Sequence, residues 1–440
     1  SLTAANTYTG TTSVSAGVLQ LGVANALANT STLLVNGGGF NFNGNSQTVA
    51  AVTLSSGSIF GSGTLTAATY DLSGGTVAST ASLGAGTMTV TGNSTLHGTS
   101  GATALNLNAG TLTLGGGSRF TSSSVAVTGS SGGALALGGN ETFGSLAGAA
   151  NVALGGNTLS VGGLGTSTTY SGAMSGAGGL EKTGAGSLTL SAANTYTGNT
   201  VITGGTLALG SLASLASGTI QVGTAASPNG ALDVTAGDLL VAANQILSGY
   251  GTVLGDVVIA NGAIVSPGGS VGVLATTGNV TFGGGGRYLF EITSASGDAG
   301  TGWDLYNVGT LDITSGPANP FIVDLLTLAN PGDQTPGLMT NWDKNLEYQW
   351  KFLVAPGTTF GEGNFDSSWF QVTVADFQNP TNGSFSVARG GSGPGGLGGS
   401  TTANELYVVY FAIPEPSTLA LASLGLAGLA WRVGRRRRAA

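Results

Sequence analysis

The sequence predicts an all-β fold: a right-handed parallel β-helix (solenoid) with a β-rich C-terminal cap and one C-terminal transmembrane helix. Three observations predict it. Similar segments recur far apart in the chain, short runs alternate apolar and polar residues, and glycine accounts for 80 of the 440 residues. Charged residues make up only 7% of the chain, where roughly 25% is usual. A helical fold is excluded because Thr, Val, Ser and Gly dominate and no 3.6-residue stripe is present.

Two segments that lie 188 residues apart carry the repeat. Residues 2–22 read LTAANTYTGTTSVSAGVLQLG, residues 190–210 read LSAANTYTGNTVITGGTLALG, and they are identical at 13 of 21 positions. Shorter apolar–glycine patterns recur between and after them. Period-2 alternation predicts half-buried strands, with Gly, Asn and Ser in the turns between them. Stacked coils explain such repetition better than a sandwich, because each coil buries its inner face against its neighbours.

The chain changes character near residue 285. We expect residues 1–285 to form the solenoid, with ladders of Thr, Asn and Ser on its faces. Few charges suit this arrangement, because like charges would repel at the ~4.8 Å spacing of stacked strands. Residues 286–412 hold more aromatic and charged side chains, and they predict a β-rich cap or irregular final coils. Their alternating runs fall at 319–328, 349–354, 369–374, 384–388 and 405–411.

The repeat resembles the autotransporter-associated β-strand repeat. Residues 178–210 carry its whole pattern, and residues 2–22 match its second half. The resemblance implies a secreted, surface-exposed parallel β-helix. The motif residues are Asn6, Thr7, Tyr8, Thr9 and Gly10 in one copy, and Asn194, Thr195, Tyr196, Thr197 and Gly198 in the other.

Residues 413–440 form a three-part tail. A stiff Pro-Glu-Pro element comes first, because proline fixes φ and restricts the residue before it. Residues 417–431 follow without a charge, and as a helix they would span roughly 22 Å of the ~30 Å hydrocarbon core. Five arginines close the tail. They favour a membrane-crossing segment whose basic end stays cytoplasmic while the body of the protein is exported.

This tail resembles the PEP-CTERM sorting signal. The resemblance implies recognition by an exosortase, a membrane transpeptidase, and export to the cell surface in association with exopolysaccharide. The residues that match are Pro414, Glu415 and Pro416 in the recognition element, and Arg435, Arg436, Arg437 and Arg438 in the stop signal.

The charge distribution excludes several functions. Residues 1–413 hold 18 acids and 6 bases, so the body is acidic and nucleic-acid binding is not expected. There is no cysteine, which excludes thiol chemistry. We predict no catalytic residue, cofactor or metal site. We expect His97 to be a surface residue, Asp298 and Asp304 to cap a turn, and Lys182 to lie at a coil edge.

The sequence therefore predicts an exported, surface- or matrix-associated, non-catalytic structural or adhesive protein. The alternative is a polysaccharide-binding or polysaccharide-active β-helix. An enzyme would need clustered carboxylates, whereas the acids between residues 233 and 312 are spread along the chain. A binding module would need exposed aromatic platforms, for which Trp303, Trp342, Trp350 and Trp369 are the candidates. The chain begins within a repeat, and we expect a secretion signal upstream of it.

Overall fold

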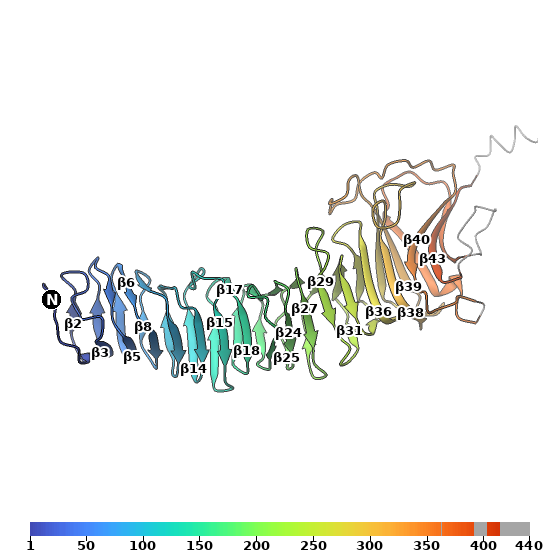
Figure 1. The fold of residues 1–440 in the computed structure, drawn as a ribbon. Coiled ribbons are helices and arrows are strands. Elements are labelled where there is room, and N and C mark those ends of the chain that lie inside the picture. Colours follow the sequence, from blue (N-terminus) through green and yellow to red (C-terminus); the bar gives the residue numbers. More distant parts are fainter. Residues whose placement is uncertain (362, 391–402, 414–440) are drawn as a thin grey trace, which may run out of the picture.

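The computed structural model describes residues 1–361, 363–390 and 403–413. Over these residues the chain winds into about 14 coils, which stack in one row from the N-terminus toward a larger C-terminal end (Figure 1). The described residues contain no α-helix, and their only helix is the one-turn 3-10 helix η1 (Ser367–Trp369). The predicted all-β parallel solenoid with a β-rich C-terminal region is confirmed. The helix predicted at 417–431 lies outside the described residues.

The strands form three parallel faces, which we call A, B and C. Face A contains β1 (Thr12–Val14), β3 (Thr32–Asn41), β5 (Ala51–Phe60), β7 (Thr69–Leu72), β10 (Thr87–Val90), β13 (Ala104–Leu107), β15 (Ala126–Gly129), β18 (Ser145–Gly148), β21 (Thr168–Tyr170), β24 (Ser187–Leu190), β27 (Thr206–Leu209), β30 (Ala231–Asp233), β33 (Thr252–Leu254), β36 (Val273–Phe282), β38 (Leu305–Ile313) and β40 (Tyr348–Val354). The second halves of β3, β5, β36 and β38 continue into face B and join the two faces in one sheet.

The remaining strands complete the other two faces. Face B contains β2 (Val18–Gln20), β8 (Thr76–Val77), β11 (Ser94–Leu96), β14 (Gly110–Leu114), β16 (Gly133–Ala136), β19 (Asn151–Gly155), β22 (Met174–Gly176), β31 (Leu239–Val241) and β34 (Val257–Ile259), and a separate pair is formed by β25 (Ala193–Asn194) and β28 (Ser214–Leu215). Face C contains β4 (Gln47–Thr48), β6 (Gly63–Thr66), β9 (Ala81–Leu83), β12 (Thr99–Ser100), β17 (Glu141–Phe143), β20 (Leu159–Val161), β23 (Leu180–Lys182), β26 (Thr200–Ile202), β29 (Thr219–Val222), β32 (Ile246–Gly249), β35 (Ile264–Pro267), β37 (Arg287–Ile292), β39 (Phe321–Thr327) and β41 (Phe370–Asp376).

Apolar ladders run along the interior of the stack. On face A, Leu188 pairs in register with Leu207, Leu207 with Leu232, and Leu232 with Val253. All four side chains are at most 1% exposed. Burying each such side chain contributes about 1.5–3 kcal/mol, and no single coil could bury it without its neighbours.

Polar ladders run along the outside of the same face, as the sequence predicts. Asp71 pairs with Thr89, Thr89 with Asn106, and Asn106 with Thr128. The Thr128 hydroxyl donates to Asn106 Oδ1 at 2.8 Å. Small polar side chains fill these positions, with one charge at Asp71 among neutral neighbours, so the stack tolerates their close spacing.

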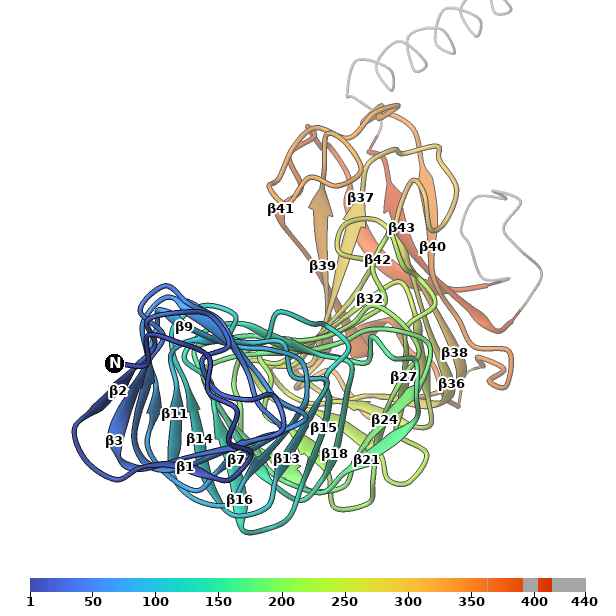
Figure 2. The ribbon, with the colours of Figure 1, turned by 60° about the vertical axis from the view of Figure 1, so that its left-hand side comes forward.

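The C-terminal end extends the parallel faces before it reverses direction. Parallel pairing crosses residue 285 through β35–β37 and β36–β38, and face C continues to β41. The last strand, β43 (Glu405–Phe411), then pairs antiparallel with both β40 and β42 (Ser384–Arg389). These strands extend beyond the cross-section of the coils (Figure 2). The five predicted runs coincide with β39, β40, β41, β42 and β43.

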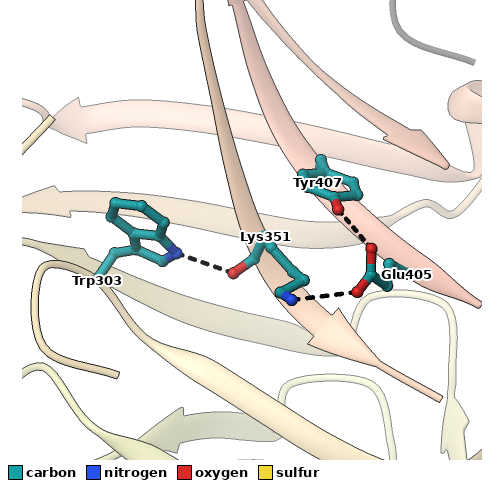
Figure 3. Close-up of polar contacts among 4 residues, drawn as sticks. All are labelled: Trp303, Lys351, Glu405 and Tyr407. Carbon is teal, nitrogen blue, oxygen red and sulfur yellow. Dashed lines mark hydrogen bonds and ion pairs between the residues drawn. The ribbon is translucent and has the colours of Figure 1, made fainter. Parts of the chain in front are cut away.

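A polar cluster ties the antiparallel strands to the coil beside them (Figure 3). Lys351 Nζ on β40 lies 3.1 Å from Glu405 Oε1 on β43, and the Tyr407 hydroxyl donates to Glu405 Oε2 at 2.5 Å. The Trp303 indole N–H donates to the carbonyl of Lys351 at 2.9 Å. The reversed end is therefore fixed to the solenoid by side chains as well as by backbone pairing.

Candidate functional site

The second copy of the repeat motif lies where one coil contacts the next. Asn194 and Tyr196 point inward and are buried, whereas Thr195 and Thr197 point outward. Asn194 Oδ1 accepts from the Met174 amide of the preceding coil at 2.9 Å, and its amide group donates to the Ala192 carbonyl. The side chain of the motif asparagine therefore accepts a hydrogen bond that a backbone carbonyl of the next coil would otherwise accept.

The Tyr196 hydroxyl begins a buried chain of hydroxyl groups. It lies 2.6 Å from Thr200 Oγ1, which lies 2.6 Å from Ser217 Oγ on the following coil. Burial raises the pKa of Tyr196, so the hydroxyl stays protonated. These contacts link consecutive coils and indicate a structural role for the motif.

Gly198 permits the close approach of two coils. A Cβ atom at this position would lie 2.4 Å from the Gly178 carbonyl oxygen. The Gly198 amide donates to that same oxygen at 3.1 Å. Only glycine fits here without moving the backbone of the preceding coil.

The first copy of the motif keeps the same local bonds in a more exposed setting. The Asn6 side chain donates to the Ala4 carbonyl at 3.1 Å, as Asn194 does to Ala192, and the Tyr8 hydroxyl lies 2.9 Å from Thr12 Oγ1. Tyr8 is 44% exposed, and Thr7, Thr9 and Gly10 are exposed as well. The tyrosine–threonine pair thus recurs in both copies.

The expected position of Lys182 at a coil edge is wrong. Its side chain is 1% exposed, and it occupies an inward position of face C between Val161 and Ile202. Its Nζ donates to the carbonyls of Thr183, Gly184 and Gly204 at 2.7–3.1 Å. Burial lowers the pKa of this ammonium group. The lysine satisfies turn carbonyls that the backbone leaves without partners.

The sorting residues lie outside the part of the chain that the structure describes. These are Pro414, Glu415 and Pro416, and Arg435 to Arg438. Within the described ranges, no helix has the length and apolar character needed to cross a membrane. The roles of these residues therefore rest on sequence alone.

Two candidate aromatic platforms are unsuited to stacking on a ligand because they are covered. Trp350 is fully buried, and Trp303 is 9% exposed with its N–H bonded to Lys351. Trp342 is partly buried and stacks on Tyr348, with ring centroids 4.9 Å apart. These three side chains pack within the C-terminal part of the fold, residues 286–413, which we call the cap.

Trp369 lies in a different setting. It ends helix η1, and together with Asn279, Thr310, Asp312, Thr358 and Asn364 it lines a groove of about 650 Å³. Asp366 caps η1 by accepting from the Ser368 amide at 2.8 Å, and Ser315 Oγ donates to the Trp369 carbonyl at 3.0 Å. These bonds fix the backbone on both sides of Trp369, and its side chain is partly buried against the core.

The groove floor is the outer side of the end of β38. Asn279 Nδ2 donates to Asp312 Oδ2 at 3.1 Å, and Thr310 Oγ1 donates to Asn279 Oδ1 at 2.8 Å. The Leu311 amide donates to Thr358 Oγ1 at 2.8 Å. Amide, hydroxyl and carboxylate groups are therefore held beside an indole ring. Sequence analysis named Trp369 as a candidate but could not find its polar neighbours.

Two acids that are spread along the sequence are brought together in the fold. Asp304 is fully buried, and its carboxylate accepts from the amides of Gly272 and Glu291 at 2.8 and 2.9 Å. Burial raises the pKa of Glu291 to about 7 and the pKa of Asp304 well above its usual range, with charge repulsion from Glu291 adding to the shift of Asp304. Asp298 lies in the predicted turn, whereas Asp304 is an interior group.

His97 is exposed, as predicted, and its carbonyl accepts from Arg119 Nη1 at 2.5 Å. Among the described residues, no group of three or more His, Asp or Glu side chains could hold a metal ion.

Two family models match the sequence. The passenger-associated-transport-repeat matches residues 1–21 and 180–209, which contain both motif copies. The PEP-CTERM protein-sorting motif matches residues 412–437. No curated protein matches the chain. The protein is therefore a parallel β-solenoid that carries passenger-associated-transport repeats and a PEP-CTERM protein-sorting motif.

Proposed function

We propose that this protein is a non-catalytic structural or adhesive rod at the cell surface or in the extracellular matrix. The PEP-CTERM motif implies an exported protein that is sorted to the cell surface and processed by an exosortase. The observation that carries the proposal is the unbroken parallel stack, in which apolar ladders fill the interior and polar ladders cover the outside. Such a stack is a long, stiff body with repeated neutral surfaces.

The arrangement of acids supports a non-catalytic role. Glycoside hydrolysis and related chemistry need two carboxylates that reach the substrate. Glu291 and Asp304 form one pair of acids, and they are only 4% and 0% exposed. Asp324 and Asp376 line a shared groove, but there the Arg287 guanidinium forms an ion pair with Asp324. Only three charged residues occur among the first 180. An enzyme that acts on polysaccharide remains the less favoured alternative.

We further propose that residues 417–431 cross the membrane before processing and that the arginines at 435–438 stay cytoplasmic. This proposal rests on the uncharged stretch and the basic cluster that follows it. After cleavage near residues 414–416, the solenoid would be free to join the surface or the matrix.

Cell fractionation of the native host tests this proposal. The wild-type protein is expected at the surface, with a C-terminus near residue 416 by mass spectrometry. Deleting residues 413–440, or making Glu415→Ala together with Pro416→Ala, should abolish sorting. His97→Ala, at an exposed residue of the solenoid, is the matched control and should be sorted normally. Unchanged surface association after the deletion would refute the sorting role.

The structural role needs a separate measurement. A strain without the protein is expected to lose cell aggregation or matrix stiffness, and the wild-type chain should restore it. A sorted protein whose absence changes neither property would contradict the structural or adhesive role.

A further inference from the structure

We propose that the groove beside Trp369 binds a neutral polysaccharide chain. This inference rests on the proposed export, because only a protein outside the cell would meet such a ligand. The groove is lined by the end of β38. This strand lies at the C-terminal end of the rod (Figure 2). Its volume of about 650 Å³ lies within the ~300–1,000 Å³ of small-ligand sites, which suits a segment of a few sugar rings.

The first argument is the indole ring. Trp342 and Trp350 stack on other aromatic rings, whereas Trp369 packs against the core on one side and contacts no aromatic ring among the described residues. Within the same residues, its indole N–H makes no hydrogen bond. The exposed part of this half-buried ring offers an apolar surface to the C–H face of a pyranose and a donor to its hydroxyls.

The second argument is the set of polar groups beside the ring. Thr310, Asp312 and Thr314 alternate with Leu311 and Ile313, so their side chains share the outer face of the strand end. Asp312 Oδ2 accepts from Asn279, and within the described residues Oδ1 has no partner. A carboxylate oxygen, an amide and hydroxyl groups together suit a ligand with many hydroxyl groups, each of which donates and accepts.

The charge of the groove selects a neutral ligand. Among the described lining residues, Asp312 is the one charged side chain, and it is negative. A uronate or sulfated polysaccharide would place like charge beside it without a cation to compensate. A neutral chain avoids this repulsion and can donate hydroxyl hydrogen bonds to the carboxylate.

A peptide strand is the competing occupant, because β40 pairs with only the first part of β38. Backbone groups at the edge of β38 beside the groove are, however, already hydrogen-bonded within the protein. The Leu311 amide donates to Thr358 Oγ1, and the Gly357 amide donates to the Gly309 carbonyl at 2.9 Å. Strand addition needs free backbone donors and acceptors at the edge, so the groove favours side-chain recognition of a glycan.

Glycan binding by the full-length purified protein tests the proposal. The probes are an array of neutral polysaccharides, cellohexaose and mannohexaose in calorimetry, and hexagalacturonate as the anionic comparison. At least one neutral probe is expected to bind, with a change in tryptophan fluorescence. Trp369→Ala should lower its affinity about tenfold or more, and Trp369→Phe should lower it less and abolish the fluorescence change.

Two further variants separate binding from folding. Asp312→Asn changes an exposed side chain, so it should keep the fold, weaken neutral binding severalfold and reduce the discrimination against hexagalacturonate. Tyr8→Ala removes an exposed aromatic ring at the far end of the solenoid and should leave binding unchanged. Each variant is checked by its thermal unfolding curve.

Three results would overturn the inference: no neutral glycan binds, binding is unchanged in Trp369→Ala, or an extended peptide binds the groove more tightly than any glycan. Failure here is distinct from failure of the proposed function. Binding is measured on purified protein, whereas sorting and matrix stiffness are measured in the host.

Discussion

The Tyr196 hydroxyl lies 2.6 Å from Thr200 Oγ1, and the same pair recurs as Tyr8 and Thr12 at 2.9 Å in the first copy of the repeat. The two pairs differ in burial, because Tyr196 is fully buried and Tyr8 is 44% exposed. One sequence motif therefore offers the same bond in two environments. Matched substitutions at the two copies can separate the effect of burial from the effect of chemistry.

Tyr196→Phe should destabilise the coils around residue 196 by about 1–2 kcal/mol. The change removes a buried hydroxyl and leaves Thr200 Oγ1 with one partner fewer. Hydrogen exchange of the neighbouring backbone amides measures the effect locally, which suits a repeat protein that need not unfold in one step. Tyr8→Phe is the control and should change exchange little, and an equal effect in both variants would contradict the role of burial.

Gly198→Ala should destabilise the solenoid by about 1–3 kcal/mol, because the new Cβ would lie 2.4 Å from the Gly178 carbonyl oxygen. Gly10→Ala is the matched control at the same motif position, where no atom lies within 4 Å of the added Cβ. Thermal unfolding monitored by circular dichroism compares the two variants. Equal melting temperatures would refute the close approach of these coils.

Lys182→Met should lower the melting temperature and speed proteolysis near residues 182–204. The substitution keeps an apolar stem but leaves the carbonyls of Thr183, Gly184 and Gly204 without the ammonium donor, at a cost of about 2–4 kcal/mol. Glu181→Gln, at the neighbouring half-buried position, is the control and should have a small effect. Wild-type stability in Lys182→Met would show that the ammonium contributes nothing.

The C-terminal cap should lose stability as pH rises from about 4.5 to about 7. Burial raises the pKa of Glu291 from 4.5 to about 7, so over this range the folded state holds a proton that the unfolded chain releases. The free energy of unfolding therefore falls with rising pH, by at most about 3 kcal/mol from this group. Tryptophan fluorescence during denaturant unfolding reports on the cap, since four of the five tryptophans lie at 303–369.

Glu291→Gln should reduce that pH dependence and make the cap more stable than the wild type above pH 7, while Asp304, whose pKa burial also raises, keeps part of the slope. Asp71→Asn, at an exposed position far from the cap, is the control and should leave the slope unchanged. A wild-type cap that gains stability between pH 4.5 and 7 would contradict the raised pKa of Glu291.

The alternation of side chains was enough to predict the strands and the solenoid. The run 405–411 became β43, and Leu107 and Leu112 became interior residues of neighbouring strands. The two-residue period, however, predicts only that successive side chains alternate between the inside and the outside of a coil. It could not show that Lys182 does so, because a charged side chain usually predicts an exposed position. The carbonyls that hold its Nζ come partly from a coil about 20 residues away.

The groove and the buried acids could not be predicted because loops of irregular length create them. Glu291 lies opposite Asp304 only because the intervening turn brings Ile292 beside Trp303. Trp369 lies beside Asp312 only because helix η1 and the loop before it return to the end of β38. Sequence periodicity does not predict the positions of such loops in the fold.

The direction of the backbone hydrogen bonds has a mechanical consequence. They run from coil to coil along the stack, so tension applied between its ends acts along these bonds and peels one coil at a time. A coil such as that from Leu188 to its partner Leu207 holds 19 residues. At ~3.4 Å per residue, each rupture releases roughly 65 Å of chain. Stretched, the protein should lengthen in steps that follow the coil lengths, such as 19 residues from Leu188 to Leu207 and 25 from Leu207 to Leu232, and dissipate energy at each one, while the remaining coils keep their shape.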